Sequence, residues 1–299
     1  MLAPIASDAE LARPDNVLRG TLLLIAATML FSVSDVTAKY VSATLPVIEV
    51  AWVRYLVFVL LTVVPAMRRG PRSLISRKPG QQVLRGVAVV ASALLFILGL
   101  QRMPIADAAA INFVAPLFIT ILSVPLLGEQ VGIRRWGAVG VGMLGAVIAA
   151  QPGTSAFQPA AAFPILSALA WAIAIVMTRK LSASDRPGTT IAWTAASGLL
   201  LLTVLLPFVA RVPTWPELAA CLLIGVAASA GQSLVVLAYR HAPASLLAPF
   251  SYLQLIWSTL LGVLVFAANP GPATILGACI IAASGLYSAN QERKRAPRR

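Results

Sequence analysis

Ten long apolar runs follow one another along the chain, and short polar segments separate them. The runs lie at residues 18–40, 46–67, 82–101, 105–127, 133–151, 161–180, 189–210, 217–239, 243–267 and 272–290. A membrane-spanning helix needs about 20 apolar residues, which is close to the length of each run. None of them shows the period-2 alternation of a membrane β-barrel strand. Because lipid offers no hydrogen bonds to the backbone, the pattern predicts an all-α membrane protein with ten transmembrane helices.

Composition narrows the class of protein further. Charged residues make up 11% of the 299 residues, whereas a soluble domain carries about 25%. A soluble globular enzyme is therefore not expected. The two cysteines, Cys221 and Cys279, both lie in apolar runs, which predicts core residues and no disulfide. A single histidine, His241, argues against membrane enzymes built on histidine clusters, so no metal and no cofactor are predicted.

The basic residues indicate how the chain is oriented. If the N-terminus lies in the cytoplasm, 18 of the 23 Lys and Arg residues fall on the cytoplasmic side. The opposite side holds Lys39, Arg102 and Arg211. This bias predicts a multi-pass protein of the bacterial inner membrane with both termini cytoplasmic. The net charge of +13 then reflects topology, so nucleic acid is not an expected partner, while membrane lipids are.

The two halves of the sequence resemble each other at a spacing of 138 to 140 residues. Arg102 matches Arg240, and Phe31 matches Trp171. Five spans in each half would make the second half enter the membrane from the opposite side, which predicts an inverted repeat suited to alternating access. A duplication retained only for packing is the alternative. The predicted segments are a tail at 1–16, repeats at 17–151 and 161–290, a linker at 152–160 and a basic tail at 291–299.

One segment carries a family resemblance. Residues 103–148, MPIADAAAINFVAPLFITILSVPLLGEQVGIRRWGAVGVGMLGAVI, combine a mid-helix Pro116, the pair Gly128-Glu129 and a glycine-rich helix. This segment resembles the EamA domain of the drug/metabolite transporter superfamily, and the second half looks like a diverged copy. The resemblance implies ten helices, cytoplasmic termini and export of small metabolites, as in amino-acid exporters of the YddG type. The second copy has Phe266-Ala267 in place of Gly128-Glu129, which departs from the family pattern.

Charged residues inside the predicted spans are candidates for a gate or for ion coupling. Ser32, Asp35 and Lys39 share one face of the first span, and Arg54 lies inside the second. Asp35 and Arg54 could pair as an outer gate, contact a charged substrate, or form a purely structural ion pair. An isolated Asp35 could instead carry a proton. Glu129 is a further gate candidate, although an ion pair with nearby arginines would also explain it.

Polar residues at mid-span are the candidates for substrate binding. In the fourth span, Pro116 leaves the carbonyl of Asn112 without its helical partner. Trp171 lies near the middle of its span, away from the interface where tryptophan usually lies. The predicted substrate-binding set, for which packing is the alternative, is Ser32, Ser92, Asn112, Pro116, Trp171, Ser229, Gln232, Tyr252 and Gln254.

These observations predict a secondary transporter that exports small metabolites, with neutral amino acids favoured because most fixed charges are peripheral. A multidrug, nucleoside or sugar exporter of the same fold is the first alternative. A channel-like facilitator is the alternative from another class, and a membrane-embedded enzyme is the least favoured. No Walker A motif is present, so ATP-driven pumping is not expected. Ten spans suffice for one transport path, which predicts a monomer.

Overall fold

The computed structural model describes residues 14–68, 70, 74–128, 133–150, 159–182, 184–209, 211–241, 250 and 253–295. Within these ranges the chain forms helices and no strands. They are α1 (Pro14–Val41), α2 (Val47–Arg68), α3 (Pro79–Leu100), α4 (Ile105–Asn112), α5 (Ala115–Leu127), α6 (Ile133–Ala150), η3 (Pro159–Ala161), α7 (Ala162–Ser182), α8 (Pro187–Leu205), η4 (Leu206–Phe208), α9 (Trp215–His241), α11 (Leu253–Phe266) and α12 (Pro272–Arg295).

The described helices agree closely with the predicted apolar runs. Seven segments are long and apolar enough to cross a membrane, and three further apolar helices are shorter. The shorter three are Trp136–Ala149, Leu253–Phe266 and Pro272–Ser284. Most of the first part of the predicted ninth span, 243–252, lies outside the described residues. The structure therefore confirms an all-helical membrane protein, while the count of ten spans stays a prediction.

The predicted break at Pro116 divides one span into two helices. The stretch Ile105–Leu127 is long and apolar enough for a single crossing, but α4 ends at Asn112 and α5 begins at Ala115. Proline has no amide hydrogen, so it cannot donate to the carbonyl four residues earlier. The chain reforms its helix with the Leu117 amide donating to Val114 at 2.9 Å. Gly128 then ends α5 in the left-handed conformation, at φ 70°.

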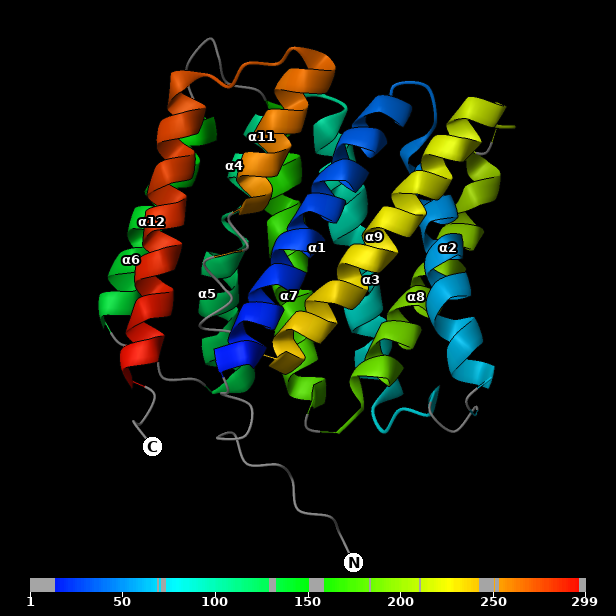
Figure 1. The fold of residues 1–299 in the computed structure, drawn as a ribbon, viewed down its shortest axis with the longest axis horizontal. Coiled ribbons are helices and arrows are strands. Elements are labelled where there is room, and N and C mark those ends of the chain that lie inside the picture. The colour runs from blue at the N-terminus through cyan, green and yellow to red at the C-terminus, as the bar shows by residue number, and fades with distance from the viewer. Residues whose placement is uncertain are drawn as a thin grey trace, which may run out of the picture.

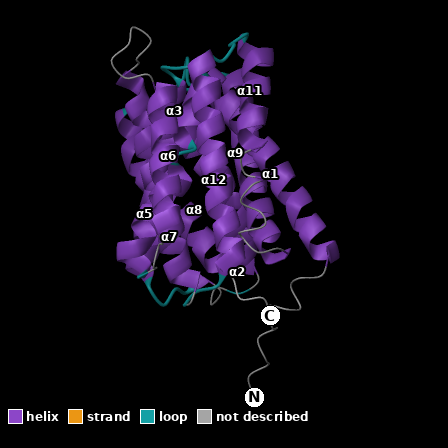
Figure 2. Ribbon diagram, turned by 90° about the vertical axis from the view of Figure 1, so that its left-hand side faces the viewer, coloured by secondary structure: helices purple, strands orange, loops and turns teal. Residues whose placement is uncertain are grey.

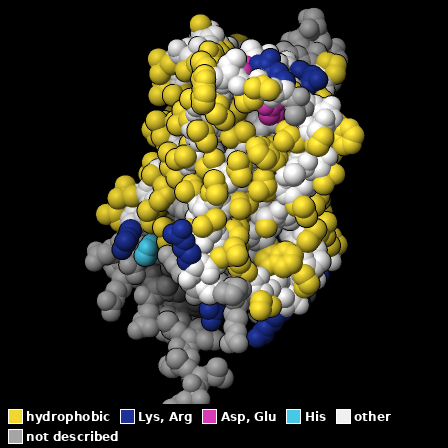
Figure 3. All heavy atoms as spheres, turned by 90° about the vertical axis from the view of Figure 1, so that its right-hand side faces the viewer, with side chains coloured by type: hydrophobic (Ala, Val, Ile, Leu, Met, Phe, Trp, Pro, Cys, Tyr) yellow, Lys and Arg dark blue, Asp and Glu magenta, His cyan; other side chains and the backbone are white. Residues whose placement is uncertain are grey.

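The helices run between two ends of the bundle, which Figures 1 and 2 show. The lower end in Figure 1 holds the start of α1 and the end of α12. The upper end holds the turn between α1 and α2 and the start of α7. On the face drawn in Figure 3, hydrophobic side chains cover the middle, and Lys and Arg gather towards the two ends. This distribution is typical of a protein that spans a bilayer.

Contacts between the two halves come in matching pairs. Helix α1 packs on α9, and its counterpart α7 packs on α3. The same holds for α2 with α9 and α8 with α3, and for α1 with α11 and α7 with α5. Helices α2 and α8 pack on each other, as do α6 and α12. Most of the inter-half contacts between described helices thus have a counterpart when the halves are exchanged, although the contact of α4 with α12 is not matched by a comparable one between α6 and α11.

Glycines let α6 and α12 approach closely, as their spacing in the sequence indicated. A Cβ added at Gly145 would lie 3.0 Å from the carbonyl oxygen of Gly277. Small residues at such positions allow backbone contact between membrane helices. The prediction that both cysteines are core residues is right for Cys221, which is buried, and wrong for Cys279. Cys279 is exposed because it lies on the outer face of α12, where an apolar side chain can meet lipid.

Candidate functional site

A polar cluster joins α1 of the first half to α11 of the second half. Ser32 lies 3.2 Å from the hydroxyl of Ser258 and donates to the carbonyl of Gln254 at 3.2 Å. The Gln254 amide nitrogen donates to an Asp35 carboxylate oxygen, also at 3.2 Å. Asp35 lies about 9 Å below the upper end of α1, at 1.5 Å per residue. The structure therefore brings together three predicted residues, Ser32, Asp35 and Gln254, well inside the bundle.

Asp35 and Arg54 do not form the direct ion pair that the sequence allowed. Arg54 is half-buried on α2, and its charge acts on the Asp35 carboxylate from beyond ion-pair distance. Between side chains that the structure describes, the ion pair within 4.0 Å joins Arg211 and Glu217 at the upper end instead. Gln254 satisfies one Asp35 oxygen in place of the guanidinium. Asp35 and Arg54 therefore do not neutralise each other by direct contact.

Lys39 holds the upper end of the first half together. Its ammonium group donates to the carbonyls of Leu100 at 2.5 Å and Met103 at 2.7 Å, and it lies 5.7 Å from the centre of the Phe266 ring. Lys39 also lines a cavity of about 550 Å³ between the upper ends of α1, α3, α9 and α11. Glu217 and Gln101 line the same cavity. We call this cavity the upper vestibule.

Five buried side-chain polar atoms have no hydrogen-bond partner among the described residues: two, on Gln81 and Gln82, lie near the lower end of α3, and three lie deeper on three helices. The deeper three are the Asn112 side-chain oxygen on α4, the Ser229 hydroxyl on α9 and the Trp257 indole nitrogen on α11. By helical rise they lie about 10, 21 and 14 Å below the upper ends of their helices. Buried polar atoms are nearly always paired, so unpaired ones at mid-depth need an explanation. Sequence reasoning selected Asn112 and Ser229 and treated Trp257 as undecided.

The other predicted residues have mixed surroundings. Ser92 and Ser167 bond each other across α3 and α7 at 3.1 Å, so Ser92 makes a helix-to-helix contact. Trp171 packs with Val114 and Phe118 in an apolar cluster, and Gln232 is half-buried on α9. Tyr252 and Glu129 lie outside the described residues, and of Pro116 the structure describes only the backbone.

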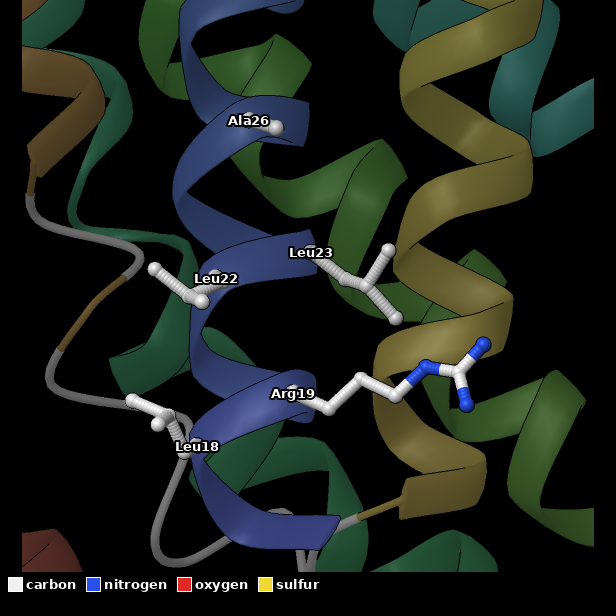
Figure 4. Close-up of a pocket in the computed structure, with 5 residues that line it drawn as sticks. All are labelled: Leu18, Arg19, Leu22, Leu23 and Ala26. Atoms are coloured by element: carbon white, nitrogen blue, oxygen red, sulfur yellow. The ribbon is translucent and has the colours of Figure 1, made fainter. Parts of the chain in front are cut away.

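A second pocket lies at the lower end of α1. Four apolar side chains and Arg19 line its volume of about 360 Å³, and Figure 4 shows Arg19 extending towards α9. The lining residues are Leu18, Arg19, Leu22, Leu23 and Ala26. None of them is a predicted substrate-binding residue. With little polarity on its walls, this pocket is a weaker candidate for binding a polar molecule than the mid-depth atoms are.

Sequence reasoning missed a buried polar cluster near the lower end. Arg85 on α3 donates to the hydroxyls of Thr178 and Thr194 and, at 3.4 Å, to the carbonyl of Thr190. Gln82, one turn earlier, donates to the Thr190 hydroxyl at 3.1 Å. Arg85 is a charged residue inside a predicted span, close to its start, and that signal could have marked it as a candidate.

Asp185 extends this cluster to the lower surface. It lies in the turn between α7 and α8 and accepts from Gln82 at 2.7 Å, from the Arg77 amide at 3.0 Å and from the Ser76 hydroxyl. Desolvation raises the pKa of Asp185, but these hydrogen bonds outweigh it and hold that pKa below its usual value. Asp185 therefore stays ionised at neutral pH and links the second half to the first.

Comparisons with known proteins identify the family. The EamA-like transporter family matches residues 18–151 and again 158–288, so the chain holds two EamA repeats. A riboflavin transporter of Rhizobium johnstonii is 31% identical over 94% of both chains. A riboflavin transporter of Vibrio cholerae is 32% identical over 94% of this chain and 96% of its own. An S-adenosylmethionine uptake transporter of Rickettsia bellii is 28% identical over 88% of this chain and 90% of its own.

A solved crystal structure shares the fold. It is 18% identical, has a TM-score of 0.65, and the match covers 93% of this chain and 99% of that chain. The riboflavin and S-adenosylmethionine relatives are named as transporters and not as enzymes, which agrees with the function class that the sequence indicated. They do not support the finer resemblance to amino-acid exporters of the YddG type. Two EamA repeats, an all-helical bundle and full-length transporter relatives establish that the chain belongs to the EamA-like transporter family.

Proposed function

We propose that the chain is a secondary transporter in which two inverted halves open alternately to the two sides of the bacterial inner membrane. Its substrate is a small polar molecule that binds at mid-depth. The matching pairs of inter-half contacts support a two-fold relation between the halves, because exchanging the halves maps most of these contacts onto one another. The bias of basic residues towards one side supports cytoplasmic termini.

The observation that carries this proposal is the set of unpaired polar atoms of Asn112, Ser229 and Trp257. One belongs to the first half and two belong to the second half. A buried donor or acceptor without a partner costs about 1 to 3 kcal/mol, which a polar substrate would recover on binding. Such atoms on helices from both halves are what a site between two moving halves requires.

Riboflavin is the substrate that we propose to test first. Two relatives about one-third identical over nearly the whole chain carry riboflavin in their names. A ring system with several hydrogen-bonding edges suits the acceptor of Asn112 and the donor of Trp257, and aromatic side chains can enclose such a ring. Neutral amino acids, exported to the outside, are the second candidate. The unneutralised charges of Asp35 and Arg54 favour them, because a zwitterion offers one group to each.

Counterflow of labelled riboflavin into proteoliposomes tests the proposal, with a panel of neutral amino acids run alongside. Saturable exchange should fall about tenfold in Asn112→Ala and in Ser229→Ala, which corresponds to one lost hydrogen bond in a dry site. Ser284→Ala is the matched control, since it removes a buried hydroxyl that already donates to Ala138 at 2.5 Å. Exchange of neither riboflavin nor amino acids would overturn the substrate assignment, and non-saturable flux would indicate a channel.

A further inference from the structure

The two ends of the bundle are joined across the halves in the same way. At the lower end, the turn between α7 and α8 of the second half contacts the segment after α2 in the first half. At the upper end, the turn between α1 and α2 of the first half lies beside α9 of the second half, because Thr44 and Glu217 line the upper vestibule together. The segment before α9 adds a second contact, from the Arg211 amide to Glu49 at 3.2 Å.

These contacts are counterparts in sequence as well as in space. Both turns close with the same backbone bond, from Asp185 to Leu181 and from Leu45 to Val41, each at 2.9 Å and 140 residues apart. We define the lower latch as the first-half residues Ser76, Gln82 and Arg85 with the second-half residues Asp185, Thr190 and Thr194. We define the upper latch as Thr44 and Glu49 with Arg211 and Glu217.

The centre of the lower latch is buried, whereas part of the upper latch is exposed. Gln82 is fully buried, and Arg85 is 6% exposed. In the upper latch Glu49 is also buried, but the Arg211 side chain is 47% exposed, and Thr44 and Glu217 line the upper vestibule. In the described conformation the lower latch is therefore packed at its centre, while the upper latch borders a cavity.

The lower latch also carries a feature that favours its release. Gln82 donates to both Asp185 and Thr190, but its side-chain oxygen is buried without a partner among the described residues. An unpaired buried acceptor raises the free energy of the closed arrangement, and opening to water would satisfy it. The second-half threonines keep bonds of their own, because Thr194 donates to the Thr190 carbonyl at 2.8 Å.

We propose that the lower latch is the gate that closes the lower end of the transport path, and that the upper latch closes the other end in the alternate conformation. Asp185 and Arg85 are gating residues that hold the halves together from opposite sides of Gln82. They do not contact the substrate. This inference rests on alternating access as proposed above, but it does not depend on which substrate is carried.

Thiol labelling tests the gate without any substrate. Ala88→Cys is the reporter, in a chain whose Cys221 and Cys279 are replaced by alanine. Ala88 is buried one turn above Arg85 on α3. A membrane-impermeant maleimide added from the lower side of proteoliposomes should react slowly with the reporter alone. Adding Asp185→Asn should raise the rate about tenfold, because a hydrogen-bonded charge is lost from the closed state.

Asp107→Asn is the matched control. Asp107 also accepts a hydroxyl across the halves, from Thr274 at 2.7 Å, but it lies at the upper end. The Ala88→Cys reporter that also carries Asp107→Asn should be labelled at the same rate as the reporter alone. An unchanged rate in Asp185→Asn, or an equal rise in both variants, would overturn the gate. If Asp185→Asn does not fold, Ser76→Ala removes a single hydroxyl of the lower latch and should give a smaller rise. Loss of riboflavin counterflow with a normal labelling response would refute only the substrate.

Discussion

The lower and upper ends of the inter-half interface use similar groups in different surroundings. At both ends a carboxylate accepts hydroxyl or amide hydrogens: Asp185 does so below, and Glu49 and Glu217 do so above. Below, the hydrogen bonds continue into the dry interior through Gln82 and Arg85. Above, they lie beside the vestibule, where water competes and an exposed ion pair contributes about 0 to 1 kcal/mol. The same chemistry therefore closes one end firmly and the other weakly.

The largest expected effect is that of removing the buried cation below. Arg85→Met should reduce riboflavin counterflow by about tenfold or more, because three hydrogen bonds from a charged group close the lower end. Thermal unfolding should change little, since Thr178 and Thr194 keep their bonds to Ala174 and Thr190. Arg85→Lys should retain part of the activity. Equal loss in Lys and Met variants with a large drop in thermal stability would mean that Arg85 serves packing alone.

A pair of glycines compares the packing of α9 on α2 with that of α3 on α8. A Cβ at Gly225 on α9 would lie 2.7 Å from Cβ of Val57, a stiff branched side chain. A Cβ at Gly86 on α3 would overlap the hydroxyl of Ser197, which can rotate away. Gly225→Ala should therefore cost about 1 to 3 kcal/mol and Gly86→Ala clearly less. Thermal unfolding in detergent measures both, and the opposite order would contradict this account of the two interfaces.

A smaller effect is expected when the exposed upper contact is weakened. Glu217 caps α9 by accepting from the Thr214 amide and hydroxyl, both at 2.8 Å, and it pairs with Arg211. Glu217→Gln keeps an acceptor at this position, so the midpoint of thermal unfolding should fall only slightly. Labelling of the Ala88→Cys reporter from the lower side should stay unchanged. A faster rate would show that the two latches do not act at separate ends.

The smallest expected effect is that of pH on the lower latch. The folded-state pKa of Asp185 lies below its unfolded value of about 3.9. Its stabilising contribution is therefore complete above about pH 3.9 and is lost only as the pH falls through the folded value. Lower-side distances between spin labels should not change between about pH 8 and pH 5. A lengthening within that window would show that another group controls the latch.

The sequence predicted what hydropathy and local chemistry determine. Runs of apolar residues gave the helices to within a few positions, and Pro116 gave the break between α4 and α5. The glycine-rich helix after Gly128-Glu129 is α6, whose Gly145 packs closely on Gly277 of α12. The helices and the break each depend on residues within a few positions of one another.

The partners of the charged groups could not be predicted, because they lie far apart in the chain. Asp35 bonds Gln254, 219 residues away, and not Arg54. Arg85 finds its acceptors on α7 and α8, about 100 residues further on. Helical periodicity places residues on a common face, but it does not say which other helix that face meets. The lower latch therefore became visible only in the folded bundle.

Distances between spin labels across each end of the bundle test most directly whether the two ends close alternately. One pair of spin labels at Ile75 and Arg186, both exposed, spans the lower latch, and a second pair at Ala43 and Val212 spans the upper latch. In Asp185→Asn we predict that the lower distance lengthens while the upper distance shortens, because the halves rock against each other. Two distances that lengthen together, or that both stay unchanged, would contradict alternate closure of the two ends.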